Sequence, residues 1–464
     1  MLGTSRLEYL WVVTWAVILH SIGPVSLLYC VVATLIPKYL RLPKYLEYWA
    51  LIETLFYFLT LGYLKYYLQS PAIHPPLLEK EERIRLFRRC FENSQDLDKL
   101  LSRWFLGTPV VDIKRENMKE WLRWAFLNTA MVDPTQDDEL ETYLVELETK
   151  LGTNFAPGRA DVKSIRLTLD KVEALHRSLT WYLCIFVVDI LTHAYMYNLG
   201  GFDFYRGSIA SSISIIPPRP QALMASYRSP TPNLSYWHRP HTAQKELPIV
   251  FLHGIGVGLY PYMQLLKEVN IGRRDEDGMI GILAVEILPI SSRICHRLPR
   301  KEDMCQQLES VLDSHGFDNF ILVSHSLTVR TPQFANEWLL WYFGSKDIGV
   351  AHTLSRTFFW SQNILWKEDL LVHHATVFLS ANDSIINAPQ VRRYLQDVDV
   401  GEHVRGNKDE ATSPEEQVAA PLERGCVDVI WCAGLDHGQV FDLPAWRERL
   451  KLEILRKARS RYVA

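Results

Sequence analysis

Three residues along the chain have the types, and the order, that nucleophilic attack on an acyl group requires: Ser326, Asp383 and His437. A serine hydroxyl is a weak nucleophile unless a neighbouring imidazole takes its proton, and that imidazole needs a carboxylate to fix its tautomer and stabilise its charged form. Ser326 is therefore the candidate nucleophile, His437 the candidate general base and Asp383 its orienting acid. Each follows closely on an apolar run of the sequence.

A glycine-containing segment upstream supplies the other part of such a site. His253, Gly254, Ile255 and Gly256 follow an apolar run, and the glycines would let the backbone turn its amides toward a developing oxyanion. We expect that oxyanion to be held by the amides of Ile255 and of Leu327, the residue after the nucleophile. His253 is interpreted as a structural residue that ties down this oxyanion loop.

Each candidate also has a structural interpretation when it is taken alone. Ser326 could cap the segment that follows it, Asp383 could be an N-cap, and His437 could lie in a turn. Ser324 offers a second hydroxyl, but the period of a strand and the elbow position favour Ser326. His325 between them is interpreted as structural, pointing away from the nucleophile. The hypothesis depends on the joint occurrence of the candidates in this order.

The elements that must position these residues are visible as apolar, β-branched runs separated by Pro and Gly. Strands are predicted over 248–252, 280–288, 320–323, 375–379 and 427–431, with a helix near 301–312. The recurrence of strand, helix and strand predicts a parallel sheet. Because the site of such a sheet lies at the carboxyl ends of its strands, the four polar segments are all expected at one edge.

These segments resemble those of a known family. Residues from about 235 to 450 resemble the α/β-hydrolase superfamily, because Leu252 to Gly256 matches its oxyanion-loop motif and Ser324-His325-Ser326 its nucleophile elbow. The whole layout further resembles membrane-anchored hydrolase-fold proteins that are common in fungi. The resemblance implies an α/β-hydrolase fold with a mostly parallel sheet. It also implies a serine ester hydrolase, of the esterase or lipase type, that uses no cofactor.

The region after the elbow departs from the family pattern. The elbow glycines are replaced by Ser324 and Thr328, and Pro332 arrives before a helix of several turns could form. We expect the helix and the strand that follow the elbow in this family to be missing. The second hypothesis is therefore a catalytically impaired hydrolase-fold membrane scaffold, or the product of an incomplete gene model.

The N-terminal region predicts a membrane anchor. Residues 10–36 are almost wholly apolar, a second run over 48–64 carries Glu53, and about 20 apolar residues cross a bilayer. We predict a transmembrane hairpin over 1–70, an integral membrane protein and the lipid bilayer as a partner. The alternative is a signal peptide cleaved near Ala33, but the run exceeds the usual apolar region of about 7–15 residues, and a second run follows.

The remaining chain divides at about residue 200. Residues 71–200 carry apolar positions at helical spacing and are predicted to be a helical region. Within it, 179–191 is too short and too polar for a span and is interpreted as a buried or interfacial helix. Its Asp189 and His193 are four residues apart and are interpreted as a structural hydrogen-bonded pair.

Residues 201–464 are expected to form the hydrolase domain. An aromatic-rich segment over 334–370 is predicted to be its cap, and such a cap suits an apolar small molecule or a lipid ester as substrate. Residues 402–424 lack aromatics and aliphatic periodicity and are predicted to be a disordered loop.

Composition excludes other classes. The chain has 50 Lys and Arg against 53 Asp and Glu, a net charge of −3, so no nucleic-acid partner is predicted. Its 7 cysteines are scattered, without a Cys-x-x-Cys pair or a Cys/His cluster at zinc spacing. Neither a disulfide framework nor a metal site is expected.

Overall fold

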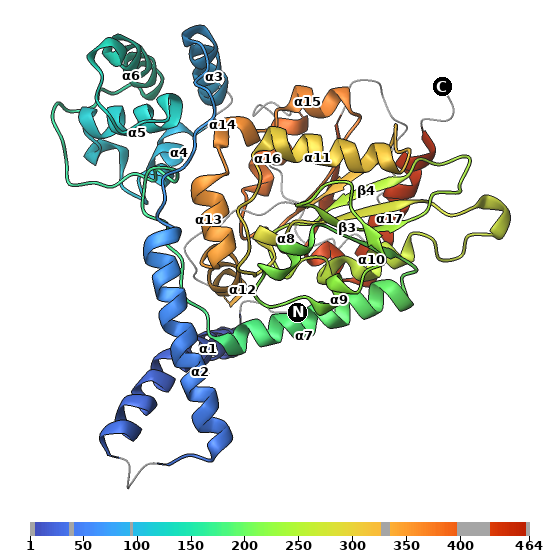
Figure 1. Ribbon diagram of the computed structural model, residues 1–464. Coiled ribbons are helices and arrows are strands. Elements are labelled where there is room, and N and C mark those ends of the chain that lie inside the picture. The colour runs from blue at the N-terminus through green and yellow to red at the C-terminus, as the bar shows by residue number, and fades with distance from the viewer. Residues whose placement is uncertain (1–4, 37–40, 93–95, 326–334, 397–426, 461–464) are drawn as a thin grey trace. The chain divides into compact units, whose positions relative to one another are not determined.

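A computed structural model of the chain describes residues 5–36, 41–92, 96–325, 335–396 and 427–460 (Figure 1). The candidate nucleophile Ser326 and its neighbour Leu327 lie outside these residues, as does the predicted loop 402–424.

A mostly parallel sheet forms the centre of the molecule's larger part (Figure 1). Its six strands have the order β2-β1-β3-β5-β4-β6, and β7 and β8 form a separate two-stranded sheet. β4 is parallel to β5 and β6, and β7 is parallel to β8, whereas β3 is antiparallel to β1 and β5. The expected α/β class with a mostly parallel sheet is confirmed. The strands are β1 (Asp203–Arg206), β2 (Tyr227–Arg228), β3 (Ser235–Arg239), β4 (Ile249–Leu252), β5 (Ile282–Glu286), β6 (Ile321–Ser324), β7 (Thr376–Ser380) and β8 (Asp428–Cys432).

Both faces of the sheet are buried at the central strands β4 and β5, as parallel strands with helices on either side require. Phe251 of β4 belongs to a core cluster with residues of α10 (Met263–Glu268) and α17 (Pro444–Ser460). Its neighbour Val250 points to the other face and packs with residues of α11 (Lys301–Ser314). The alternation of side chains along one strand therefore fills two cores.

The sheet is interrupted between β6 and β7. Within the described ranges, β6 pairs only with β4, and its Leu322 side chain is 54% exposed. Cys432 of β8 and Val323 of β6 nevertheless pack in the same core cluster, so the two sheets share a core. The break lies at the point in the chain where the sequence predicts that the family's helix and strand are missing.

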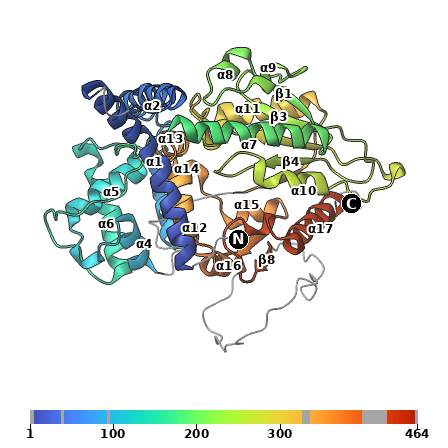
Figure 2. The same ribbon diagram turned by 90° about the horizontal axis from the view of Figure 1, so that it is seen from below.

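The long helix α7 (Leu179–Asn198) runs along the sheet-containing part. In the view from below it lies in front of the sheet (Figure 2). One face is buried, with Ile185, Asp189 and Met196 at helical spacing. The interpretation of Asp189 and His193 as a bonded pair is wrong, because the Asp189 carboxylate accepts its hydrogen bonds from two arginines and Gln221.

The remaining helices of the larger part are short. They are α8 (Ile209–Ile213), α9 (Pro220–Leu223), α12 (Ala335–Leu339), the π-helix η7 (Leu340–Ser345), α13 (Ile348–Arg356), α15 (Lys367–Val372), α16 (Ala388–Gln396) and the single turns η4 (Tyr260–Tyr262), η5 (Asp275–Asp277), η6 (Leu288–Ile290) and η8 (Gln439–Phe441).

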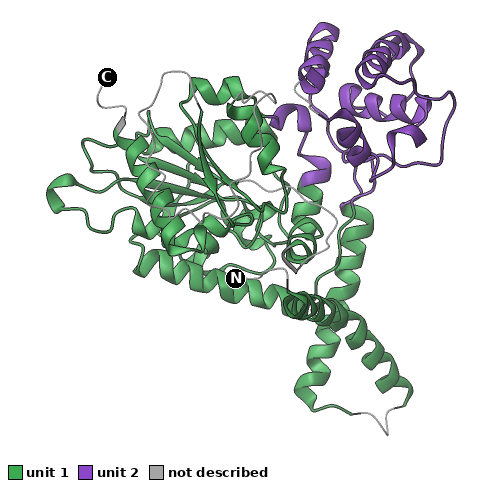
Figure 3. Ribbon diagram, turned by 180° about the vertical axis from the view of Figure 1, so that it is seen from behind, with its two compact units in different colours: residues 1–67, 173–353, 365–464 green, residues 68–172, 354–364 purple. Residues whose placement is uncertain are grey.

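Two compact units make up the chain (Figure 3). The smaller one comprises residues 68–172 and 354–364 and has its own aromatic core. Its helices are α3 (Lys80–Glu92), α4 (Leu97–Trp104), α5 (Arg115–Leu127), α6 (Asp137–Leu151) and α14 (Trp360–Asn363), with single turns η2 (Val110–Asp112) and η3 (Pro134–Gln136).

The segment expected to be a cap is not a single element. Trp360 packs in the smaller unit, where its ring lies 5.5 Å from that of Phe126 and its Nε1 donates to the Ala125 carbonyl. Tyr342 lies in the larger unit under the guanidinium of Arg177. The aromatic residues of this segment therefore serve two cores.

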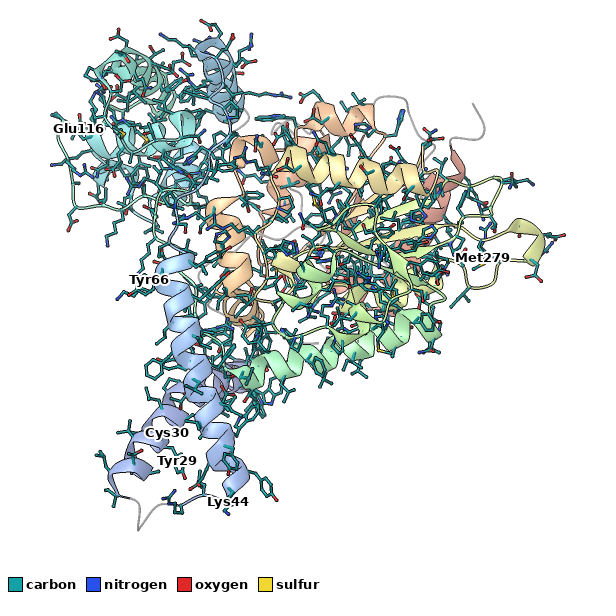
Figure 4. All side chains as sticks on the ribbon, viewed as in Figure 1. Tyr29, Cys30, Lys44, Tyr66, Glu116 and Met279 are labelled. Carbon is teal, nitrogen blue, oxygen red and sulfur yellow. The ribbon has the colours of Figure 1, made fainter. Side chains whose placement is uncertain are left out.

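The N-terminal helices α1 (Arg6–Leu35) and α2 (Lys44–Gly62) pack against each other as a hairpin, and α2 continues as the π-helical turn η1 (Tyr63–Tyr67). Near the free end of the hairpin, where Figure 4 labels Tyr29 and Lys44, the Tyr29 hydroxyl donates to Glu47 at 3.0 Å. Among the described helices, α1 and α7 are long and apolar enough to cross a membrane. The predicted second span α2 is not among them.

The carboxylate of Glu53, in the middle of the second apolar run, has a structural role. It is fully buried, and its two oxygens accept hydrogen bonds from the amides of Leu179 and Thr180, each at 2.8 Å. These amides belong to the first turn of α7, where a helix has unsatisfied N–H groups and favours negative charge. Glu53 thus fixes the start of α7 to the hairpin.

Candidate active site

Asp383 and His437 form the centre of the candidate site. His437 Nδ1 lies 2.8 Å from Asp383 Oδ2, and both side chains are largely buried. The two residues meet because β7 and β8 are parallel and in register, with Ser380 opposite Cys432 at their carboxyl ends. A main-chain bond from Asn382 N–H to the Leu435 carbonyl holds the two following loops together.

The surroundings of Asp383 keep its carboxylate ionised. Burial raises the pKa of Asp383, but the hydrogen bond from His437 and those from the amides of Ile385 and Ile386 outweigh this effect, so that the pKa falls below its usual range. An ionised Asp383 can only accept, so the His437 proton stands on Nδ1 and the lone pair on Nε2.

The Nε2 atom of His437 is buried and has no hydrogen-bond partner among the described residues. An unpartnered buried nitrogen is unfavourable in a folded protein, and a role in a reaction is one explanation for it. This nitrogen is therefore available as a proton acceptor.

A second carboxylate nearby has a different role. Asp436 Oδ1 accepts hydrogen bonds from the backbone amides of His437 at 2.7 Å and Ser384 at 2.8 Å. It thereby fixes the two loops, whereas Asp383 is the residue that bonds the imidazole ring.

His253 holds the predicted oxyanion loop in place. Its Nδ1 donates to the Gly254 carbonyl at 2.8 Å, and its Nε2 accepts from the amide of Ile287 at 2.9 Å. The second bond ties the end of β4 to the residue after β5, which agrees with the structural role expected for His253. Burial lowers the pKa of His253, so the neutral imidazole that both bonds require is maintained.

The remaining residues of the loop differ in their backbone contacts. The Gly256 amide donates to the Ile290 carbonyl, whereas the Ile255 amide has no partner among the described residues. A Cβ atom at position 254 would lie 3.0 Å from Nδ1 of His325, so only glycine fits there without a shift. Ile255 is one of the two residues whose amides are predicted to hold the oxyanion, and the other, Leu327, lies outside the described residues.

His325 lies against the candidate base rather than away from the site. Its ring stacks on that of His437 with centroids 4.8 Å apart, and its Nδ1 accepts from the Tyr262 hydroxyl at 2.8 Å. Tyr262 in turn accepts from the Gly254 amide. Burial and the neighbouring His437 lower the pKa of His325 to about 3, so it stays neutral.

Tyr262 is a residue that the sequence did not single out. It links the oxyanion loop to the end of β6, and no motif or period marks it. His325, the last described residue after β6, stacks on His437, and Ser326 follows it in the sequence outside the described residues. Among the described residues no group of three or more metal-ligating side chains is present.

Comparison with known proteins gives distant structural likenesses. No family model and no curated protein matches the chain. Among solved structures, it is similar to the carboxylesterase CesB from Bacillus subtilis, at 8% identity over 59% of this chain and 96% of that chain, with a TM-score of 0.32. It is also similar to a membrane phospholipase A described as a bacterial virulence factor, at 8% identity over 60% of this chain and 94% of that chain, with a TM-score of 0.34.

Proposed function

We propose that the chain is a membrane-attached serine hydrolase that cleaves esters through Ser326, His437 and Asp383. The observation that carries the proposal is the buried Asp383–His437 pair, because His437 Nε2 has no hydrogen-bond partner among the described residues and the His437 ring stacks on that of His325. The residue after His325 is a serine. An acid, a base and a nucleophile in this relation are the parts that acyl transfer requires.

The reaction proceeds in two halves. Ser326 Oγ attacks the ester carbonyl carbon while His437 Nε2 takes the hydroxyl proton, and Asp383 stabilises the imidazolium. The amides of Ile255 and Leu327 hold the oxyanion, and His437 returns the proton to the departing alcohol. Water then attacks the acyl-enzyme with His437 again as base, which releases the acid and restores the serine.

The proposed substrates are esters of apolar acids, including lipid esters. The support is the attachment of the catalytic unit to a hairpin whose exposed side chains include Leu28, Leu51 and Leu59, because such a hairpin holds the site near lipid. The test is turnover by the full-length protein of a series of esters with increasing acyl length. Rising kcat/KM with chain length supports the assignment, and turnover of none of them contradicts it.

Stable membrane attachment is the first expected property of the full chain. The exposed apolar surface of α1 and α2 has no cover among the described residues, and burying it in lipid is strongly favourable. We expect the protein to stay in the pellet when membranes are washed with carbonate at high pH. Quantitative release into the supernatant would contradict insertion, because surface attachment by charge alone does not survive this treatment.

A non-catalytic scaffold is the second candidate function, favoured by the break in the sheet. The helix after a nucleophile elbow directs its N-terminal amides toward the developing charge, and the strand after it would lie beside β6, whose outer edge is open among the described residues. A chain without this unit would retain the fold and lose the chemistry.

The transcript distinguishes the two candidates. A complete hydrolase would contain an in-frame insertion of roughly 30–60 residues between Ser326 and Phe334, enough for one helix, one strand and their turns. Sequencing of the cDNA is expected to find this insertion if the sequence derives from an incomplete gene model. If the cDNA agrees with the given sequence and the purified protein turns over no ester, the scaffold is the correct assignment.

A further inference from the structure

The outer face of α7 is apolar and carries no charge. Opposite the buried residues of this helix, the side chains of Leu183, Val187 and Leu191 are 49%, 48% and 56% exposed. The only formally charged residue from Leu179 to Asn198 is Asp189, and it is buried. A continuous exposed apolar stripe of this kind marks an interaction surface rather than ordinary solvent-facing helix.

The segment that contains α8 and α9 extends this surface. From Gly207 to Tyr227 the only charged residue is Arg219, which is buried. Ile213 and Met224 of the same segment are 66% and 84% exposed. α9 lies directly beside α7, because Gln221 Nε2 donates to the Asp189 carboxylate at 2.5 Å.

The two single charges of these segments neutralise each other inside the protein. Arg219 Nε donates to Asp189 Oδ2 at 2.9 Å, and Arg293 Nη2 donates to Asp189 Oδ1 at 2.7 Å. Arg219 also makes a two-pronged pair with Glu286, with both N–O distances 2.8 Å. The chain thus places its charges on the inner side and leaves the outer side uncharged.

α7 is long and apolar enough to cross a membrane, but its network of buried charges excludes this role. If α7 crossed a bilayer, the Asp189 carboxylate would leave Arg219 and Arg293, and a buried charge that loses its partners is strongly unfavourable. The helix therefore keeps its inner face on the sheet-containing unit. We propose that the outer face of α7, with the α8–α9 segment, lies in the surface of the lipid bilayer that the α1–α2 hairpin enters.

The lipid bilayer is the occupant because this surface is continuous with the membrane hairpin. Glu53 of α2 accepts hydrogen bonds from the amides of Leu179 and Thr180 in the first turn of α7. The apolar stripe of α7 therefore begins where the hairpin meets the sheet-containing unit. In Figure 1 the hairpin projects beyond α7, on the side away from the sheet. An uncharged face of this kind would bind zwitterionic and anionic lipid alike.

Two native cysteines provide the test. Cys184 on α7 and Cys305 on α11 are both exposed. The full-length protein is placed in phosphatidylcholine nanodiscs, which leave both lipid faces open, and treated with a charged, membrane-impermeant maleimide. We expect Cys184 to react at least roughly tenfold more slowly than Cys305, because lipid covers it. Both should react to the same extent after the disc and the fold are dissolved in sodium dodecyl sulfate.

The outcomes separate this inference from the proposed function on which its membrane attachment rests. If the protein is in the disc and Cys184 reacts as fast as Cys305, the surface placement of α7 is wrong. Protection that requires two copies in a disc would instead make this face a chain–chain interface. Failure of the protein to enter the disc would contradict membrane attachment itself, and ester turnover is measured separately on the same sample.

Discussion

Ester turnover is expected to fall by at least about 10⁴-fold when His437 is replaced by alanine, because residues that act as a unit in acyl transfer lose nearly all of their contribution together. Of the two ring nitrogens of His437, only Nε2 can take the serine proton, because Nδ1 donates its hydrogen bond to Asp383. The fold should persist, because the ring's other contact among the described residues is its stacking on His325. The measurement is kcat/KM on an ester that the wild-type protein hydrolyses.

A matched control comes from another histidine of the same unit. His373 is exposed at the end of α15 and precedes the start of β7, whereas Asp383 follows the opposite, carboxyl end of that strand. His373→Ala should retain wild-type turnover. If His437→Ala also kept turnover within about tenfold, general-base catalysis by His437 would be excluded, since such a base contributes at least about 10²-fold.

The exchange of Asp383 for asparagine is expected to lower kcat by about 10⁴-fold, as it does where an acid of this kind fixes a tautomer. Asparagine can keep the acceptor for the Ile385 and Ile386 amides at Oδ1. Its NH₂ group would then face His437 Nδ1, which must become an acceptor. The ring proton moves to Nε2, so His437 can no longer take a proton from the serine.

The same exchange at the neighbouring acid is the control. Asp436 Oδ1 accepts hydrogen bonds from the backbone amides of Ser384 and His437, and the side-chain oxygen of an asparagine can accept both. Asp436→Asn should therefore leave kcat within a few-fold of wild type. If the two variants lost activity equally, Asp383 would not be the orienting acid.

The parallel half of the fold could be predicted because each of its strands is a short, almost wholly apolar run. β4 and β5 are covered on both faces, so their sequences show hydrophobic runs rather than alternation. β1 and β3 were not predicted. Both strands mix charged and aromatic residues. Arg239 of β3 is buried, with its guanidinium on the ring of Phe202 and donating a hydrogen bond to the Gly200 carbonyl.

The site could be predicted in part for a related reason. Asp383 and His437 follow strand ends, and the order of the elements brings strand ends together. Tyr262 and Glu53 could not be found in this way. Their roles come from single contacts with residues far along the chain, Tyr262 with His325 and Glu53 with Leu179. No period or motif in one sequence records such contacts.

The nucleophile itself is tested most directly by a fluorophosphonate probe, which reacts only with a serine activated by a neighbouring base. The full-length protein is labelled and the modified residue is identified by mass spectrometry. We expect one adduct, on Ser326, which is lost in Ser326→Ala and His437→Ala and retained in Ser324→Ala. Absence of any adduct in a folded protein, or an adduct on Ser324 in place of Ser326, would contradict the account.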